Sequence, residues 1–121
     1  MTDAELSAIV GIGGDTSIRN AEDLSMEKAL RRTRYRDLRG ELSHESLAAA
    51  LRGSPQAVEQ WVMYSQDKRT NRGWALEAEA CRIHRPDHPN SSYTFASLPE
   101  AVAAYILHEL DYWSGRATEP P

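Results

Sequence analysis

The sequence predicts an α+β domain in which N-terminal helices precede a β-hairpin and a C-terminal helix packs on that hairpin. Apolar residues recur at helical spacing in the first half of the chain and again over residues 98–113, whereas residues 74–95 combine alternating polarity with turn-forming residues. A length of 121 residues, with 40% hydrophobic and 26% charged residues, suits one soluble domain with a single core. We expect this domain to span residues 1–115, with some flexibility over residues 1–20 and a disordered tail over residues 116–121.

Two helices are expected before residue 40. Thr2 and Glu5 have the spacing of a capping box, which predicts a helix over residues 3–10. Three glycines within residues 11–14 then predict turns, and we interpret this segment as a linker. The second helix is expected to end near Gly40. Its cap is predicted to be Asn20 or Ser25, and its inner face Leu24, Ala29 or Leu30, Tyr35 and Leu38.

Residues 43–66 predict two further helices. Ser43 caps the first, and Gly53 ends it. Ser54 followed by Pro55 starts the second, with serine at the N-cap and proline at the first helical position. Their inner faces are predicted to hold Leu47, Ala50 and Leu51 in the first helix, and Val58, Trp61, Val62 and Ser65 in the second.

Residues 74–84 fit either a strand or a helix, since their composition favours a helix and their polarity alternates as in a strand. The turn-forming run over residues 85–92 and the β-prone residues 93–95 favour a strand, and therefore a hairpin over residues 74–95. The polar residues 67–73 predict a loop, with Trp61 and Trp74 as core anchors on either side of it.

The C-terminal helix has the clearest pattern. Ser97 and Glu100 have the spacing of a capping box, and Gly115 stands where the helix should stop. One face of the helix is predicted to hold Val102, Ile106, Leu110 and Trp113.

The net charge of −4 conceals an asymmetry. Residues 28–39 hold six basic residues and one acid, a local charge of +5, so the remaining 109 residues sum to −9. Such a basic stripe indicates either a nucleic-acid surface or a solvated helix face with acids beside it, and ordinary surface behaviour favours the second interpretation. The single cysteine, a lack of signal-peptide pattern and the lack of a long apolar run predict a cytoplasmic protein that does not enter a membrane.

No pattern in the chain predicts catalysis. Residues 11–14 are glycine-rich but have neither the context of a phosphate loop nor that of a dinucleotide site. Cys81, His84 and His88, with Asp87 beside them, have the chemistry of zinc ligands, but they fall in an exposed turn without a further ligand pair. We therefore expect no metal, no cofactor and no enzymatic activity.

Residues 42–51 run Leu-Ser-x-Glu-x-Leu-Ala-x-x-Leu, and residues 54–61 run Ser-Pro-x-x-Val-x-x-Trp. This pattern resembles the helix-turn-helix of phage-repressor-like regulators. The resemblance implies a second helix in the DNA major groove. The implied base contacts are Gln56, Ala57, Glu59 and Gln60, and the implied phosphate contacts are Arg31, Arg32 and Arg34. The acids Glu59 and Asp67 and the acidic body of the chain oppose this reading.

A second pattern covers residues 61–110. It begins with Trp-Val-Met-Tyr-Ser-x-Asp-Lys-Arg-Thr-x-x-Gly-Trp, continues with the hairpin and ends with Leu-Pro-Glu-Ala-Val-Ala-Ala-Tyr-Ile-Leu-His-Glu-Leu. In residues and in order of elements it resembles small bacterial immunity proteins of polymorphic and contact-dependent toxin systems. That resemblance implies a protein that neutralises a cognate toxin by covering its active site.

The expected function is therefore non-enzymatic binding of a cognate toxin, for which an acidic surface would speed association with a basic toxin. A DNA-binding regulator or antitoxin is the alternative, and a phage-encoded inhibitor of a host defence complex is a third reading. Nucleic acid is not the expected partner, and the oligomeric state is left open. The predicted partner contacts are Tyr64, Asp67, Lys68, Arg69, Glu77 and Glu79.

Overall fold

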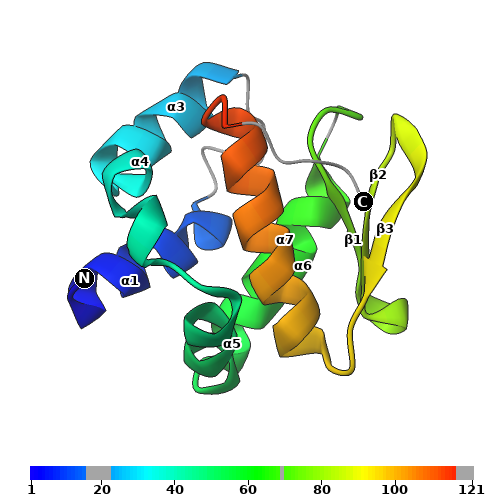
Figure 1. Ribbon diagram of the computed structural model, residues 1–121, viewed down its shortest axis with the longest axis horizontal. Helices are drawn as coiled ribbons and strands as arrows, with labels where there is room; N and C mark the ends of the chain where they lie inside the picture. The colour runs from blue at the N-terminus through cyan, green and yellow to red at the C-terminus, as the bar shows by residue number, and fades with distance from the viewer. Residues whose placement is uncertain (16–22, 69, 117–121) are drawn as a thin grey trace.

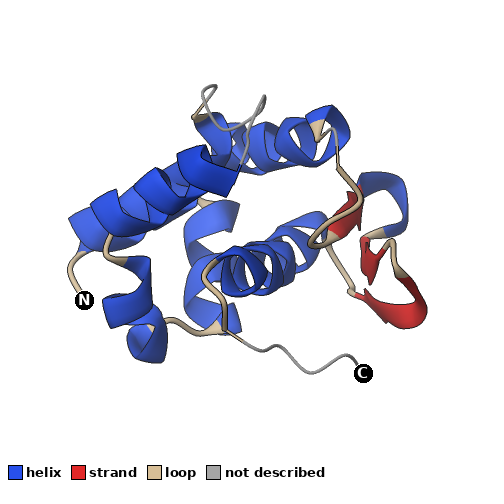
Figure 2. Ribbon diagram, turned by 90° about the horizontal axis from the view of Figure 1, so that it is seen from above, coloured by secondary structure: helices blue, strands red, loops and turns tan. Residues whose placement is uncertain are grey.

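The computed structural model describes residues 1–15, 23–68 and 70–116. Within these ranges it has six α-helices and a three-stranded antiparallel sheet, which confirms the predicted α+β class. The C-terminal helix α7 (Leu98–Trp113) runs through the middle of the molecule, with the N-terminal helices on one side and the sheet on the other (Figure 1). Seen from above, the sheet forms a small layer at one end of the helical body (Figure 2).

The helices begin where the capping residues predict. The starts after Thr2, Ser43, Ser54 and Ser97 belong to α1 (Asp3–Val10), α5 (His44–Arg52), α6 (Pro55–Asp67) and α7. In α1, Thr2 Oγ1 accepts from the Glu5 backbone N–H at 3.1 Å, and the Glu5 carboxylate accepts from the Thr2 N–H at 2.8 Å. Ser54 makes no side-chain capping bond, so α6 relies on Pro55 at its first position.

Residues 11–14 are not the linker that their glycines predict. They form a 3₁₀ turn, η1 (Gly11–Gly14), whose Ile12 is fully buried. A Cβ atom placed on Gly13 would lie 2.5 Å from the indole of Trp61, so glycine is required for the close approach of this turn to α6. Within residues 1–15, Ile9, Val10 and Ile12 belong to the core and Leu6 packs against it. The flexibility expected for residues 1–20 stays a prediction, and residues 16–22 lie outside the described residues.

The single helix predicted between residues 24 and 38 is also wrong. The chain forms α3 (Asp23–Arg32), a short α4 (Tyr35–Leu38) and a 3₁₀ turn, η2 (Arg39–Glu41). The break falls at Thr33, whose hydroxyl donates to the Ala29 carbonyl at 2.8 Å, and at Arg34, whose φ of 57° is left-handed. Ser25 lies inside α3 and does not cap it, and Asn20 is outside the described residues.

The helices α5 and α6 bury most of the predicted positions. Leu47, Leu51, Val58 and the fully buried Trp61 lie in the core as expected. Ala48 takes the place predicted for Ala50, which is only partly buried. The Ser65 hydroxyl accepts a hydrogen bond from the Leu76 N–H at 2.9 Å, which joins α6 to the first strand.

The region predicted as one hairpin contains three strands. The strands are β1 (Ala75–Glu77), β2 (Arg82–Arg85) and β3 (His88–Thr94), with β2 in the centre. Residues 74–84, predicted as one strand, are divided by the 3₁₀ turn η3 (Ala78–Ala80) and by Cys81, whose φ is 49°. Leu76 consequently pairs with Ile83, and Ile83 pairs with Tyr93.

The predicted eight-residue turn shrinks to Pro86 and Asp87, because β3 already begins at His88. β3 is an edge strand, where Asn90 and Ser92 face solvent, and an edge tolerates turn-forming residues that a central strand excludes. The polar, turn-forming composition of this segment therefore indicates that it is exposed to solvent, but it does not indicate its backbone conformation, which is a strand.

Three of the four residues predicted for one face of α7, namely Val102, Ile106 and Leu110, are fully buried, and so is Trp74. The fourth, Trp113, is partly buried against the core. Gly115 follows the helix with a φ of 78°. Among the residues predicted as a tail, 117–121 lie outside the described residues.

Candidate functional site

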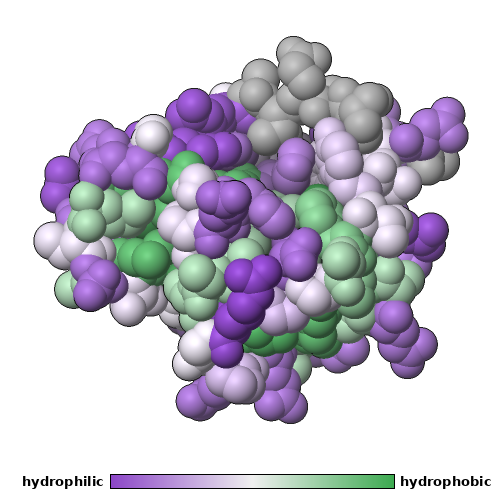
Figure 3. Space-filling model, turned by 60° about the horizontal axis from the view of Figure 1, so that its bottom comes forward, coloured by the Kyte–Doolittle hydropathy of each residue, from purple (hydrophilic) through white to green (hydrophobic). Residues whose placement is uncertain are grey.

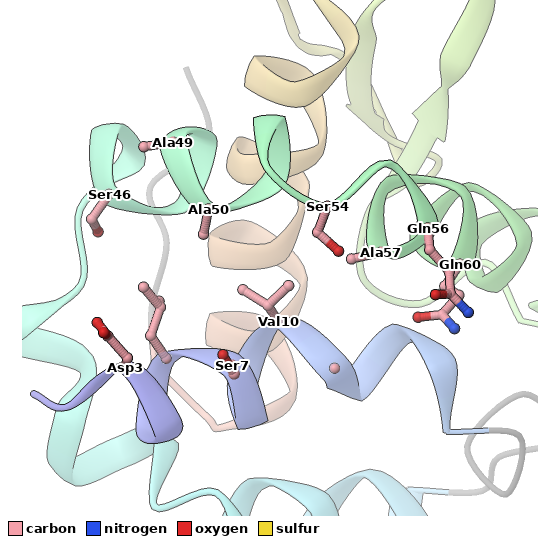
Figure 4. Close-up of a pocket in the computed structure, with 12 residues that line it drawn as sticks. Asp3, Ser7, Val10, Ser46, Ala49, Ala50, Ser54, Gln56, Ala57 and Gln60 are labelled. Carbon is pink, nitrogen blue, oxygen red and sulfur yellow. The ribbon is translucent and has the colours of Figure 1, made fainter.

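A groove with a volume of about 780 Å³ lies between α1 on one side and α5 and α6 on the other (Figure 4). Short side chains keep it hollow, because α5 and α6 present alanine and serine where longer residues would fill the space. The described residues that line it are Asp3, Leu6, Ser7, Val10, Gly11, Ser46, Ala49, Ala50, Ser54, Gln56, Ala57 and Gln60.

The groove has an apolar floor and a polar margin. Figure 4 shows Val10 and Ala50 facing each other across it, with Ser46, Ser54 and Gln56 along its length. The space-filling view with the bottom of the molecule turned forward shows apolar patches between polar side chains (Figure 3). Such a surface can bury apolar side chains of a ligand while the margin forms hydrogen bonds.

Three acids lie in or beside the groove, and the cation Arg52, one turn after Ala49, pairs with Glu100 at 3.5 Å. Asp3 is the charged residue in the lining. Glu45 lies one helical turn before Ala49, and Glu59 lies one turn after Gln56, so both share a helix face with the lining. Asp3, Glu45 and Glu59 are exposed, and none has an ion pair with a described residue. Their negative potential is therefore available to an approaching molecule.

The basic stripe over residues 28–39 differs from the groove in its charge pairing, because its arginines form ion pairs with acids of several elements. The ion pairs are Arg31 with Glu27 at 3.1 Å, Arg32 with Asp15 at 3.3 Å, Arg34 with Glu5 at 3.3 Å, Arg36 with Glu27 at 2.7 Å and Arg39 with Asp111 at 2.8 Å. Hydrogen bonds from Arg36 hold the pKa of Glu27 below its usual range. The stripe is thus a surface whose charges are largely matched within the fold.

Two of the predicted partner contacts belong to the interior. Tyr64 is 3% exposed, and its hydroxyl donates to the carboxylate of the fully buried Glu109 at 2.8 Å. Lys68 Nζ pairs with the same carboxylate at 2.8 Å and donates to the carbonyls of Arg72 and Trp74. Burial raises the pKa of the Tyr64 hydroxyl well above its ordinary value. Tyr64 and Lys68 thus hold the fold together, and the contact role expected of them stays a prediction.

The other predicted contacts are dispersed. Asp67 is exposed at the end of α6, and Arg69 lies outside the described residues. Glu77 in β1 pairs with Arg82 at 2.7 Å and lies 3.0 Å from His84 Nδ1. Glu79 is exposed in η3 and does not share a strand face with Glu77, because the turn separates them. Asp67, Glu77 and Glu79 do not line the groove. The binding role of these three residues and of Arg69 stays a prediction.

The residues predicted for base reading are only partly presented to solvent. Gln56 and Glu59 are exposed, whereas Ala57 is buried. A Cβ atom on Gly14 would lie 2.7 Å from the Gln60 side chain, so η1 covers that residue. The α6 face predicted to enter DNA is therefore flanked by α1 and η1.

Two carboxylates in α7 escaped the sequence analysis. Glu109 accepts from Tyr64, from the Trp74 backbone N–H at 2.8 Å and from Trp113 Nε1 at 3.1 Å. Asp111, also buried, accepts from the Tyr35 hydroxyl at 2.7 Å. The sequence does contain a sign of this role. Both residues are acids inside an otherwise apolar helical run, where a buried carboxylate needs hydrogen-bond or ion-pair partners.

The described residues contain no group of three or more histidine, cysteine, aspartate or glutamate side chains that could hold a metal ion. In that same part of the chain, no helix combines the length and the apolar character needed to cross a membrane. Comparison with known proteins found no match: no family model, no curated protein and no solved structure matches this chain.

Proposed function

We propose that this chain is a non-enzymatic protein-binding module that neutralises a cognate bacterial toxin, and that the groove receives a basic, partly apolar segment of that toxin. The observation that carries the proposal is the combination of a hollow apolar floor with acids at its margin that have no ion pair with a described residue. Burying apolar surface contributes roughly 25 cal/mol per Å² before the costs of association, so the floor can supply affinity. The acids speed the encounter with a basic partner and disfavour acidic ones.

The resemblance over residues 61–110 to immunity proteins supports the choice of a toxin as partner. In this reading the chain acts in the cytoplasm and covers the toxin without altering it chemically. An inhibitor of a host defence complex would use the same groove with a different partner, so the identity of the bound protein separates these two readings.

A matched pair of variants tests the groove. Ala49→Arg places a cation on an exposed position of the lining, whereas Ala8→Arg makes the same charge change at an exposed position of α1 that does not line the groove. Because both positions are exposed, both variants should fold. The assay is growth of bacteria that express a candidate toxin domain together with each form of this chain.

Protection by the parent chain and by Ala8→Arg, with loss of protection by Ala49→Arg, is the expected result. Purified complexes should show the same order in calorimetry. The DNA-binding alternative is tested in parallel with a generic duplex over a salt series, because phosphate contacts lose affinity steeply as salt rises. Salt-sensitive duplex binding without protection against the toxin would reverse our ranking of the two functions.

A further inference from the structure

A second, smaller pocket lies at the C-terminal end of α7. Its volume is about 230 Å³, and the described residues that line it are Tyr35, Arg36, Arg39, Ser114, Gly115 and Arg116. Three of these six residues carry guanidinium groups, and none is acidic. The acids that balance Arg36 and Arg39, namely Glu27 and Asp111, do not line the pocket.

The end of α7 brings Arg116 to this place. Gly115 has a φ of 78°, which reverses the chain after the helix. The Gly115 N–H donates to the Tyr112 carbonyl at 3.2 Å, and the Arg116 N–H donates to the Asp111 carbonyl at 2.9 Å. This Schellman motif fixes the backbone of Arg116 beside Arg36 and Arg39, and it also satisfies carbonyls that would otherwise repel an anion.

The three guanidinium groups retain donors for a ligand. A guanidinium has five N–H donors. Arg36 uses three of them, two on the Glu27 carboxylate and one on the Ser114 carbonyl. Arg39 directs two, Nε–H and one on Nη2, at Asp111. The Arg116 side chain makes no hydrogen bond or ion pair with a described residue.

The carboxylates also hold two of the arginines in place. Glu27 binds Arg36 through both oxygens, and Asp111 does the same for Arg39, so these side chains lose little freedom when a ligand arrives. Arg36, Arg39 and Arg116 against Glu27 and Asp111 leave a net charge of +1 around the pocket. A small oxyanion would bring the sum toward zero or below.

From this arrangement we infer that the pocket binds the phosphate group of a small molecule, either inorganic phosphate or a small phosphate monoester. Tetrahedral phosphate oxygens can accept from three guanidinium groups at once, whereas a flat carboxylate suits one or two. This site is separate from the groove, and its occupation does not depend on the proposed toxin-binding function.

Calorimetric titration with inorganic phosphate tests the inference, with sodium chloride at equal ionic strength as the reference. Arg116→Ala is the informative variant, because its exposed side chain has no hydrogen-bond or ion-pair partner to lose among the described residues. Arg31→Ala is its matched control, since it removes the same charge from a side chain that is 78% exposed and lies outside the pocket. Arg116→Ala should weaken phosphate binding roughly tenfold, as expected for a lost charge-assisted bond. Arg31→Ala should leave phosphate binding unchanged.

Titrations with glycerol phosphate and with acetate separate the sources of the oxyanion. Tighter binding of the monoester than of inorganic phosphate assigns the pocket to a phosphorylated metabolite, and the reverse order assigns it to free phosphate. Equal weakening by Arg116→Ala and Arg31→Ala would reduce the effect to general charge attraction and overturn the inference. A lack of saturable phosphate binding, or binding of acetate as tight as that of phosphate, would overturn it as well.

Discussion

The α3–α4 segment and the margin of the groove are both strongly charged, yet they use charge differently. Along the segment, Arg31, Arg32, Arg34, Arg36 and Arg39 all meet acids, whereas Asp3, Glu45 and Glu59 beside the groove meet no described cation. The run of arginines dominates the sequence, but much of its field is cancelled by residues distant in the chain. A charge run therefore marks a surface, and the pairing of its charges decides how strongly it can attract a ligand.

The largest effect is expected from removing the acid of a buried ion pair, that of Arg39 with Asp111. Asp111→Asn leaves Arg39, whose side chain is 21% exposed, without its carboxylate, and it weakens the bond from Tyr35. We expect a loss of about 3 kcal/mol in the free energy of unfolding, measured by urea denaturation. Asp37→Asn is the control, because that acid is 74% exposed and pairs with Arg34 at 3.8 Å, and it should cost less than about 0.5 kcal/mol. Equal losses in the two variants would contradict the contrast between buried and exposed pairing.

The next effect concerns the packing of η1 on α6. Gly13→Ala inserts a methyl group against the Trp61 indole and should cost about 1–3 kcal/mol in the free energy of unfolding, since the packed turn must shift. Gly11→Ala adds the same group where no heavy atom lies within 4 Å, so it should be close to neutral. Thermal denaturation of both variants provides the measurement. A neutral Gly13→Ala would mean that η1 is not held against α6 as described.

His108 extends the comparison of paired and unpaired charges, because it is an ionisable side chain surrounded mainly by aromatic rings. It lies 4.5 Å from the Trp74 ring centroid and 5.4 Å from that of Tyr93. Burial lowers the pKa of His108 below 6.5, the charges of Arg39 and His44 act in the same direction, and Asp111 opposes them.

Below pH 6.5 the unfolded chain takes up a proton at His108 more readily than the folded chain does, so the fold loses stability as the pH falls through that value. The change in unfolding free energy between pH of about 7.5 and about 5.5 should be smaller in His108→Gln than in the parent chain. His88→Gln, at an exposed position, should leave that change unaltered. An identical pH dependence in His108→Gln and the parent chain would exclude this role.

The smallest effect is expected from a variant that tests whether ion pairs with acids keep the arginines of the basic stripe from binding DNA. Glu27→Gln releases Arg31 and Arg36 from their shared carboxylate, and we expect weak duplex binding to appear at low salt. The slope of log affinity against log salt should steepen by roughly one to two units, one for each added phosphate contact. Glu59→Gln makes the same charge change beside the groove and should not produce this binding. Strong duplex binding by the parent chain would show that the acids do not mask the stripe.

Much of the fold was predictable because local chemistry agrees with it. Serine or threonine caps located the starts of α1, α5 and α7, and helical spacing identified the buried face of α7. Two of the errors, the unbroken helix before residue 40 and the single strand over residues 74–84, fall where a non-glycine residue takes a left-handed conformation, at Arg34 and Cys81. Neither arginine nor cysteine predicts a left-handed turn, since the backbone strain of that conformation is offset by tertiary packing and not by the residue itself.

The candidate site was less predictable than the fold. Gln56 and Gln60 could be singled out from the sequence, but nothing local indicated that α1 would lie opposite them and create a groove. Tyr64 and Lys68 looked like surface residues because their partner, Glu109, is more than 40 positions away. Both errors have one cause: the exposure of a side chain depends on segments that are remote along the chain.

The backbone amide of Trp74 affects how the sheet can unfold locally from the rest of the protein. Its N–H donates to Glu109 in the C-terminal half of α7, so the strand that follows cannot separate from the body without exposing a buried carboxylate. Deuterium exchange at this amide should therefore be as slow as at the best-protected amides of the protein, whereas Asn71 nearby is exposed and should exchange quickly. The sheet and the C-terminal helix then behave as one cooperative unit, and an isolated excursion of the sheet is disfavoured.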